Sequence, residues 1–306
     1  MSVKILEPYS ILRFQHFKEW FAEACVSAGI NKLSDIPLSW NARLIIGKLG
    51  LCFHLGPSSK NKLIICSSGK PNYFSWPWCY IYDIIPVVWD CWPECEATLL
   101  KFVKRNKIKT IFCTASQTAD LVRRTYPDVD AVWLPEGIKI SEYPKGGDLV
   151  SRKIDILELG RNMPCVHSAI LKHQFYRPIR HLYQSESLVF PDNDSMIHGM
   201  QDTKISICYP QSMTHPEHAG NIETMTQRYW EFMLTGAVIA GHAPQELVDF
   251  CGYNPVVELG VNPAVQLDEI LSSIATYQPL VDKNRETAER IGSWESRMDL
   301  VKEHLK

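Results

Sequence analysis

The sequence lacks long apolar runs and any strong excess of one charge. The apolar stretch YIYDIIPVVWD is interrupted by Asp83, Pro86 and Asp90, well short of the roughly 18 uncharged residues of a membrane-spanning helix. The net charge is -2 with a pI near 6.6, whereas nucleic-acid-binding domains usually carry a basic field. The opening MSVKILEPYSILRF also lacks the basic and then apolar pattern of a signal peptide. These absences predict a cytoplasmic protein and argue against nucleic acid as its main partner.

The cysteines and histidines lack the spacing of a disulfide framework or of a zinc finger. The ten cysteines lie mostly inside apolar runs such as LIIC, IFC and ISIC, where a free thiol behaves as a small hydrophobic side chain. Cys91 and Cys95 flank WPE, and His215 and His218 flank PE, but neither pair has a partner pair at zinc-binding spacing. Reduced thiols fit the cytosol. We expect no metal site and no bound cofactor.

Short β-branched runs alternate with helix-length amphipathic segments along the 306 residues, which is typical of parallel sheets covered by helices. The length favours two cores, and a segment rich in Gly, Pro and charge at 139–152 predicts a linker. We therefore predict an α/β domain at 1–145, a second at 146–285 and a closing helix at 286–306. Strands are predicted at 3–7, 43–47, 62–66, 83–89, 109–113, 130–135, 153–160, 187–191, 204–210, 237–241 and 254–260.

One segment, NIETMTQRYWEFMLTGAVIAG at 221–241, places two acids around the start of a helix. Thr226 can cap this helix, whose amino terminus offers free N–H groups and partial positive charge to an anion. Arg228 can neutralise a phosphate, and Glu231 can accept hydrogen bonds from sugar hydroxyls. The alternative is that Glu223 is an ordinary loop acid and Glu231 a solvated helix residue. The residues alone leave both interpretations open.

The spacing of these acids resembles a known motif. Glu223 and Glu231 have seven residues between them and are followed by FMLTGAVIAG, which is similar to the E-x(7)-E donor-site motif of the group 1 glycosyltransferases. The run TIFCTASQTADLVRRTYPDVDAVWLPEGI resembles that family's strand, serine, helix, strand and P-x-G order, and KIDILELGR resembles the strand that opens its donor domain. The matching positions are Ser116, Pro135, Glu136, Gly137, Gly160 and Arg161.

The resemblance implies the α/β GT-B fold, in which two Rossmann-like domains face a central cleft. GSWESRMDLVKEHL is similar to the family's last helix, which crosses back to the first domain. The first domain would bind the acceptor and the second the nucleotide-sugar. The resemblance further implies metal-independent transfer with retention, with Glu223 at the transferred sugar and Glu231 at the ribose. The donor diphosphate would be held by Gly160, Arg161, Thr226, Arg228 and the helix amino terminus.

The chain departs from the family pattern between the acids, where TMTQRYW replaces a common G-F-G turn, and after Arg161, where the usual lysine is absent. His54 could match a sugar-contacting histidine of the first domain or be a core residue. Asp90 follows a strand and could act as a general base, a role that belongs to inverting chemistry. The aromatic stretch at 76–92 could bind a sugar or pack in the core. The basic side chains of 101–109 with Arg123 and Arg124 could contact an acceptor or a membrane, or be solvated.

From these features we expect a glycosyltransferase that moves a sugar from a nucleotide-diphosphate sugar to a hydroxyl acceptor, such as a glycan or a lipid-linked glycan. The expected setting is surface polysaccharide or glycan assembly, with peripheral contact at the inner face of the membrane. Three alternatives stay open. The chain could be a catalytically lapsed GT-B subunit that binds nucleotide or a partner, a transferase acting on hydroxylated DNA bases, or a nucleotide-sugar epimerase of the same fold.

Overall fold

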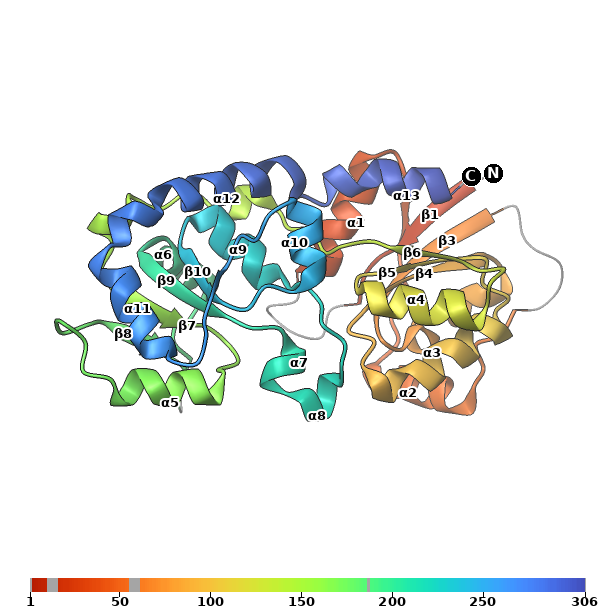
Figure 1. Ribbon diagram of the computed structural model, residues 1–306. Helices are drawn as coiled ribbons and strands as arrows, with labels where there is room; N and C mark the ends of the chain where they lie inside the picture. The colour runs from red at the N-terminus through yellow and green to blue at the C-terminus, as the bar shows by residue number, and fades with distance from the viewer. Residues whose placement is uncertain (1, 10–15, 55–60, 186–187, 306) are drawn as a thin grey trace. The chain divides into compact units, whose positions relative to one another are not determined.

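The computed structural model describes residues 2–9, 16–54, 61–185 and 188–305. The chain forms two compact units (Figure 1). Unit 1 comprises residues 1–137, 217–222 and 294–306, and unit 2 comprises residues 138–216 and 223–293. Across the described ranges, every helix is too short or too polar to span a membrane.

Unit 1 is built on a six-stranded sheet of order β2-β1-β3-β4-β5-β6, in which every pairing is parallel. Side chains alternate between its two faces, as the two-residue period of a strand requires. Leu63 and Ile65 pack on one side, while Ile64 and Cys66 pack on the other. The strands are β1 (Ser2–Leu6), β2 (Asn31–Leu33), β3 (Asn61–Ser68), β4 (Asp83–Trp89), β5 (Thr110–Cys113) and β6 (Asp130–Trp133).

Helices cover both faces of this sheet (Figure 1). α3 (Pro93–Arg105) and α4 (Ser116–Thr125) contribute to one hydrophobic core, and α1 (Phe17–Ser27) and α13 (Met298–His304) contribute to the other. A core with helices on both sides is what near-continuous apolar strands such as DIIPVVW predict.

The predicted strand at 43–47 is wrong, because these residues lie inside helix α2 (Trp40–Leu49). The side chain of Ser39 caps the helix by accepting from the Ala42 N–H at 3.3 Å, and Gly50 ends it in the left-handed conformation at φ 65°. Arg43 is buried and pairs with Asp35 at 2.6 Å. The β-branched pair Ile45 and Ile46 indicated a strand, but the two caps and the buried ion pair favour the helix.

Unit 2 has a five-stranded parallel sheet of order β11-β10-β9-β7-β8. The strands are β7 (Ile154–Glu158), β8 (His181–Tyr183), β9 (Thr203–Cys208), β10 (Val238–Gly241) and β11 (Val257–Glu258). α5 (Pro164–Lys172) and α11 (Pro263–Ser272) pack on one face, and α9 (Gln227–Thr235) packs on β9 and β10 with α6 (Asn193–Gln201) and α12 (Gln278–Ile291) beside it (Figure 1). α10 (Gln245–Cys251) connects β10 to β11.

The predicted strand at 187–191 is also wrong, since its described residues form no strand and the edge strand is β8. Asp192 explains part of the difference: it forms a capping box with Ser195 and starts helix α6, so the preceding residues lead into a helix.

A buried acid joins β8 to the rest of this sheet. The carboxylate of Asp155 in β7 accepts hydrogen bonds from Arg177 at 2.6 and 3.1 Å, from Lys204 of β9 at 2.7 Å and from the Arg180 N–H at 2.9 Å. Burial opposes ionisation of Asp155, but these hydrogen bonds outweigh it and lower its pKa to about 2. The ionised carboxylate therefore fixes the segment that enters β8 against β7 and β9.

Two segments that lie late in the sequence complete unit 1. The chain leaves unit 2 for residues 217–222, where short helix α8 (Pro216–Ala219) ends, after α7 (Gln211–Thr214). It returns to unit 1 again at Trp294, whose ring packs edge-on against Phe21 and Trp89 with centroids 5.1 and 5.9 Å away. Gly137 fits against Trp294 so closely that an added Cβ would lie 2.7 Å from the ring. The predicted α/β fold with a last helix on the first sheet is confirmed.

Candidate functional site

The carboxyl ends of the unit 2 strands carry most of the predicted site residues. In open parallel sheets, ligands bind at this edge, at the point where strand order reverses. The order here reverses between β7 and β9, because β8 lies on one side of β7 and β9 lies on the other. Gly160 and Arg161 follow β7, and the amino terminus of α9 lies at the same edge because α9 connects β9 to β10.

Helix α9 has the predicted limits. Thr226 takes the extended N-cap conformation, without a side-chain cap bond, and Gly236 ends the helix in the left-handed conformation at φ 83°. The loop before it is held by Glu246, whose buried carboxylate accepts from the Met225 N–H at 2.6 Å. The first N–H groups of the helix have no intrahelical acceptor, so this terminus keeps the partial positive charge expected of an anion site.

Glu231 is buried and engaged at both carboxylate oxygens. Its Oε1 accepts from the Tyr143 hydroxyl at 3.0 Å, and its Oε2 lies 2.5 Å from Nη1 of Arg228, one turn earlier. The Glu231 side chain is 9% exposed, whereas Arg228 is 30% exposed. Burial, together with the charge and the hydrogen bond of Glu231, raises the pKa of Tyr143. The solvated-helix alternative for Glu231 is therefore not what the structure shows, and Arg228 pairs with Glu231 while staying partly exposed.

Glu223 lies at the start of a chain of polar contacts that ends at β11. Its Oε1 is 3.3 Å from the Gln245 N–H and 3.4 Å from Nε2 of His242, while Nδ1 of His242 is 2.9 Å from Glu258 Oε2. Burial opposes ionisation of Glu258, but hydrogen bonds from the Ala243 N–H, Asn254 and His242 lower its pKa. His242 thus joins two acids at the carboxyl edge of the sheet.

Gly160 and Arg161 form an exposed turn directly after β7. Gly160 has φ 90°, a conformation that favours glycine, and a Cβ built there would meet nothing within 4 Å. The turn therefore leaves open space beside its backbone, and Arg161 is exposed next to it.

The residues predicted in the first domain lie in unit 1. Asp90 follows β4 at the carboxyl edge of its sheet and takes φ 47°, an uncommon conformation for a residue other than glycine. His54 lies 4.0 Å from Asp83, the first residue of β4, so it belongs to the amino edge. Ser116 begins α4, and the backbone carbonyls of Pro135 and Glu136 accept hydrogen bonds from Arg297. The structure thus gives Asp90, and not His54, a place where ligands of such sheets bind.

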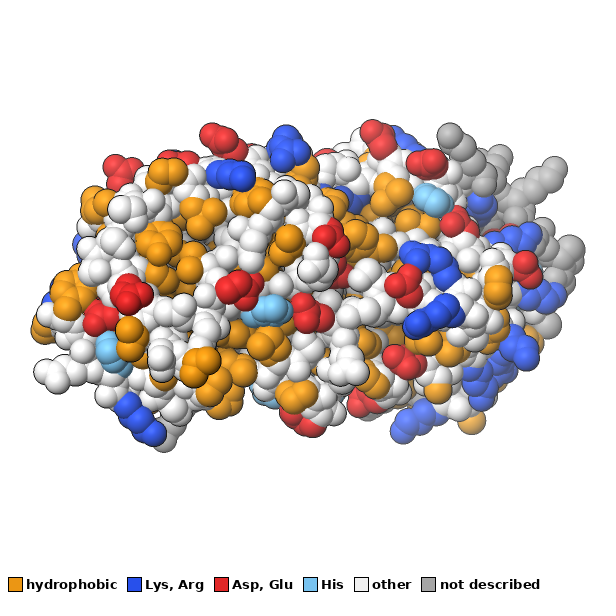
Figure 2. Space-filling view, viewed as in Figure 1, with side chains coloured by type: hydrophobic (Ala, Val, Ile, Leu, Met, Phe, Trp, Pro, Cys, Tyr) orange, Lys and Arg blue, Asp and Glu red, His pale blue; other side chains and the backbone are white. Residues whose placement is uncertain are grey.

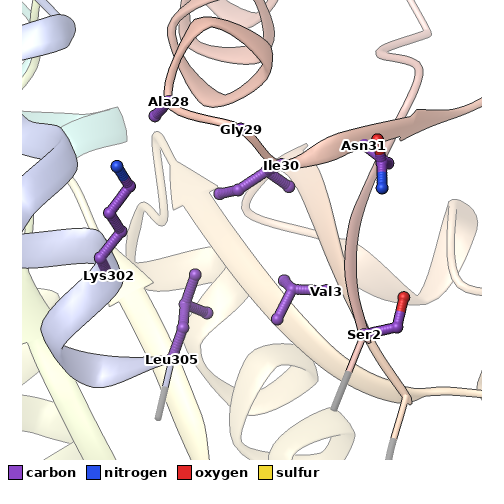
Figure 3. A pocket seen from close by; sticks show the side chains of 8 residues that line it. All are labelled: Ser2, Val3, Ala28, Gly29, Ile30, Asn31, Lys302 and Leu305. Atoms are coloured by element: carbon purple, nitrogen blue, oxygen red, sulfur yellow. The ribbon is translucent and has the colours of Figure 1, made fainter.

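Two surface features of unit 1 lie apart from these residues. A hollow of about 500 Å³ opens between β1, the turn before β2 and α13 (Figure 3). Among the described residues that line it, Lys302 alone is charged. Basic side chains also gather on the side of unit 1 that carries α3 and α4 (Figure 2), where Lys104, Arg105, Arg123 and Arg124 are exposed in the last turns of these helices.

Several polar residues of unit 2 were not predicted from the sequence. His242 and Glu258 come at the ends of two predicted strands, and that position was the available signal, because carboxyl ends of parallel strands meet at one edge. Tyr143 lies in the predicted linker and gave no signal. A further group, Glu158 with His167 and His181, brings its donor atoms within 4.8 Å of one another.

Comparisons with known proteins bear on the fold. Neither protein-family models nor curated protein sequences match the chain. The structure is similar to sucrose-phosphate synthase from Thermosynechococcus elongatus, with a TM-score of 0.62, 10% identity and coverage of 99% of this chain and 98% of that one. It is similar to the E. coli trehalose-6-phosphate protein bound with UDP-2-fluoro glucose, with a TM-score of 0.59, 9% identity and coverage of 99% and 98%.

A third similar structure is TarM, with a TM-score of 0.55 and 13% identity. The match covers 86% of this chain and 57% of TarM, so the chain spans somewhat more than half of that protein's length. At such identities the likeness concerns the fold alone. The chain therefore has the GT-B fold of two Rossmann-like units, as the E-x(7)-E resemblance implied.

Proposed function

We propose that this chain is a glycosyltransferase that moves a sugar from a nucleotide-diphosphate sugar to a hydroxyl acceptor with retention. One observation carries the proposal: Glu223 and Glu231 frame the amino terminus of α9 at the carboxyl edge of unit 2, where the strand order also places Gly160 and Arg161. An anion site flanked by two acids suits a donor with a diphosphate in its middle and hydroxyl groups at either side.

The diphosphate is assigned to the amino terminus of α9, the open turn at Gly160, and the side chains of Arg161 and Arg228. These groups supply positive charge without a Mg²⁺ or Mn²⁺ ion. The uridine diphosphate sugar bound by the E. coli relative supports a donor of this class. Arg228 keeps its contact with Glu231 on one side, and the exposed part of its guanidinium contacts phosphate on the other.

Glu231 is assigned to the ribose and Glu223 to the transferred sugar. Each carboxylate oxygen can accept more than one hydrogen bond, so Glu231 can accept from a ribose hydroxyl while Tyr143 stays bound. Glu223 is more exposed than Glu231, and His242 and the Gln245 N–H hold its carboxylate in place. Because this carboxylate is already oriented, binding a sugar hydroxyl costs little further side-chain conformational entropy.

The groups assigned to the donor support the proposal of retention. The departing phosphate oxygen can take the acceptor proton on the face from which the sugar leaves, so no protein base is required. Arg161, Arg228 and the helix terminus stabilise the charge that develops on the leaving diphosphate. Asp90 in unit 1 would be the base of an inverting reaction, and it is the residue on which the opposite outcome would depend.

Two experiments test the proposal. A thermal-shift screen of nucleoside diphosphates and their sugars, without added Mg²⁺ or Mn²⁺, should find a stabilising ligand; at about a hundred times its dissociation constant the gain is roughly 2.7 kcal/mol. The product formed from an α-linked donor should then show an α anomeric proton coupling by NMR. A strict need for added Mg²⁺ or Mn²⁺ contradicts the metal-free diphosphate site, and a β product contradicts retention.

A catalytically lapsed GT-B subunit is the second candidate. It is favoured by the closed network of Glu231, Arg228 and Tyr143, since these groups already bind one another. A lapsed subunit would bind nucleotide or a partner and release no sugar from any donor. Stabilisation by a nucleoside diphosphate, with neither hydrolysis nor transfer across a donor panel, would identify it.

A further inference from the structure

Two histidines and one glutamate from three successive elements meet beside the carboxyl end of β7. Glu158 is the last residue of β7, His167 lies in α5, and His181 is the first residue of β8. Nδ1 of His167 is 2.8 Å from Glu158 Oε1, and Nε2 of His181 is 2.7 Å from the same oxygen. All three donor atoms lie within 4.8 Å of one another.

The group is largely shielded from water. The side chain of Glu158 is 1% exposed, that of His181 is 9% exposed and that of His167 is 21% exposed. Both imidazole rings also pack against the ring of Tyr183, with centroids 4.7 and 4.8 Å away. The rings are thus held in place by packing, and one edge of the group stays open at His167.

The distribution of hydrogen bonds over Glu158 is uneven. Both histidines converge on Oε1, whereas the buried Oε2 has no hydrogen-bond partner among the described residues. A buried carboxylate oxygen without a partner is costly. A cation that this carboxylate binds through both oxygens would compensate its charge and give Oε2 a partner.

We propose that Glu158, His167 and His181 bind a divalent transition-metal ion, with Zn²⁺ as the best fit. Two imidazole nitrogens and one carboxylate are a common zinc ligand set, and they leave a fourth position for water. Imidazole ligands also favour zinc over Mg²⁺ or Ca²⁺, which prefer oxygen. The exposed edge at His167 gives the fourth ligand access.

Metal binding requires the three donor atoms to rearrange, because the two imidazole nitrogens, now within 4.8 Å of each other, must also reach the spacing of a metal site. In a tetrahedral site with bonds of about 2.0–2.1 Å, neighbouring ligand atoms are about 3.3 Å apart. The nitrogens must therefore move away from Glu158 Oε1 by roughly 0.5 Å. Each neutral imidazole must also carry its proton on the other nitrogen, which is Nε2 in His167 and Nδ1 in His181.

This inference departs from the sequence-based expectation of no metal site and does not rest on the proposed glycosyl transfer. These ligands lack zinc-finger spacing in the sequence, because strand order brings them together. The ion would hold Glu158 in place, two residues before the turn at Gly160 and Arg161. It is a resident ion of unit 2 and not the ligand of a donor diphosphate.

The test measures metal binding by the full chain after removal of bound metal with a chelator. Cys165 is replaced by serine in every sample, because its thiol is exposed while the other cysteines are buried. Titration with Zn²⁺ against a chromogenic chelator should give one zinc per chain. Co²⁺ in its place should give the intense visible absorption of a four-coordinate ion.

His167→Ala and His181→Ala should each weaken zinc binding by at least about 100-fold, because each removes a ligand. His173→Ala is the matched control. Its Nε2 pairs with Asp268 at 3.1 Å in the same unit, without the third donor, so binding should not change. Far-ultraviolet circular dichroism confirms that each variant is folded, and the titration of the Cys165→Ser parent does not depend on either histidine variant.

Two results would overturn the proposal. One is a Cys165→Ser parent chain that binds no stoichiometric zinc, which would identify the group as a hydrogen-bonded cluster. The other is zinc binding that His167→Ala and His181→Ala leave as strong as in the His173→Ala control. Neither readout uses transferase activity, so failure here is separate from failure of the proposed function.

Discussion

Replacement of Glu231 by alanine removes the carboxylate that joins Tyr143 to Arg228 inside unit 2. Tyr143 loses a hydrogen bond of 3.0 Å to a charged group, which is worth about 1.5–3 kcal/mol. Arg228 is 30% exposed and can turn towards water, so its ion pair contributes closer to the roughly 0–1 kcal/mol of a surface pair. Alanine recovers a few tenths of a kcal/mol of helix propensity. We expect the free energy of unfolding to fall by about 2–3 kcal/mol.

The control is Glu289→Ala. Glu289 is an exposed helix residue that pairs with Arg285 at 2.7 Å in the same unit. Glu289 makes the same kind of Glu–Arg pair but contacts no buried tyrosine. Its replacement should therefore lower the free energy of unfolding by less than about 1 kcal/mol. Tyr143→Phe should cost nearly as much as Glu231→Ala, and the double variant should cost little more than either one, because both changes remove one interaction.

The same variants separate a binding role of Glu231 from a structural one. Loss of a ribose hydrogen bond to a carboxylate should weaken nucleotide binding by about 10- to 100-fold in Glu231→Ala. Tyr143→Phe should weaken it less, since Tyr143 acts only through Glu231. Stability is measured by urea unfolding and affinity by calorimetry. Additive stability losses for Tyr143 and Glu231 would refute the assigned contact, and wild-type nucleotide affinity in a folded Glu231→Ala chain would refute the ribose role.

Further predictions concern the acids of both units and one glycine. Glu223→Gln should lower kcat at least about tenfold with nucleotide affinity nearly unchanged, because its contact is to the transferred sugar; equal kcat would exclude that contact. Asp90→Asn should keep kcat within about threefold of wild type, and a loss beyond about 100-fold would point to a general base. Asp155 has its pKa lowered to about 2, so its stabilisation is complete above about pH 4 and disappears as the pH falls to about 2. Asp155→Asn should therefore lower the free energy of unfolding by up to roughly 2.5 kcal/mol at pH 7, and this free energy should then depend less on pH between pH 4 and 2. An unchanged acid-unfolding transition would contradict this. Gly137→Ala places a Cβ 2.7 Å from the Trp294 ring, which should destabilise unit 1 by about 1–3 kcal/mol and speed proteolysis after residue 293. Wild-type stability would show that Trp294 can move to make room for the Cβ.

The fold was predictable where local and long-range preferences agree. Helix α9 and strand β10 have the expected limits, because an apolar helical period ends at Gly236 and a β-branched run follows. The expectation failed at 43–47, where a short apolar run fits helix and strand equally well. The deciding interaction there is the buried pair of Arg43 with Asp35, which depends on tertiary contacts.

The site was predictable only in part. Residues on one continuous segment, such as Glu223, Thr226 and Arg228, could be placed from their spacing and from the predicted limits of the helix. The contact of Tyr143 with Glu231 joins residues 88 positions apart, and that of His181 with Glu158 depends on which strand pairs with β7. A sequence pattern shows strand identity but not strand order, so these partners could not be assigned.

The return of the chain to unit 1 at Trp294 has a consequence for biosynthesis. A ribosome makes unit 1 strands first, but the side chains of α13 that cover one face of that sheet emerge only after unit 2 has been made. At roughly 5–20 residues per second, the roughly 160 residues between Gly137 and Trp294 take about 8–30 s. During this interval unit 2 can complete its own core while Phe21 and Trp89 still lack Trp294 as a neighbour. The unit that begins folding first is therefore the one that finishes last, and until then its uncovered apolar face is a surface on which the nascent chain can aggregate.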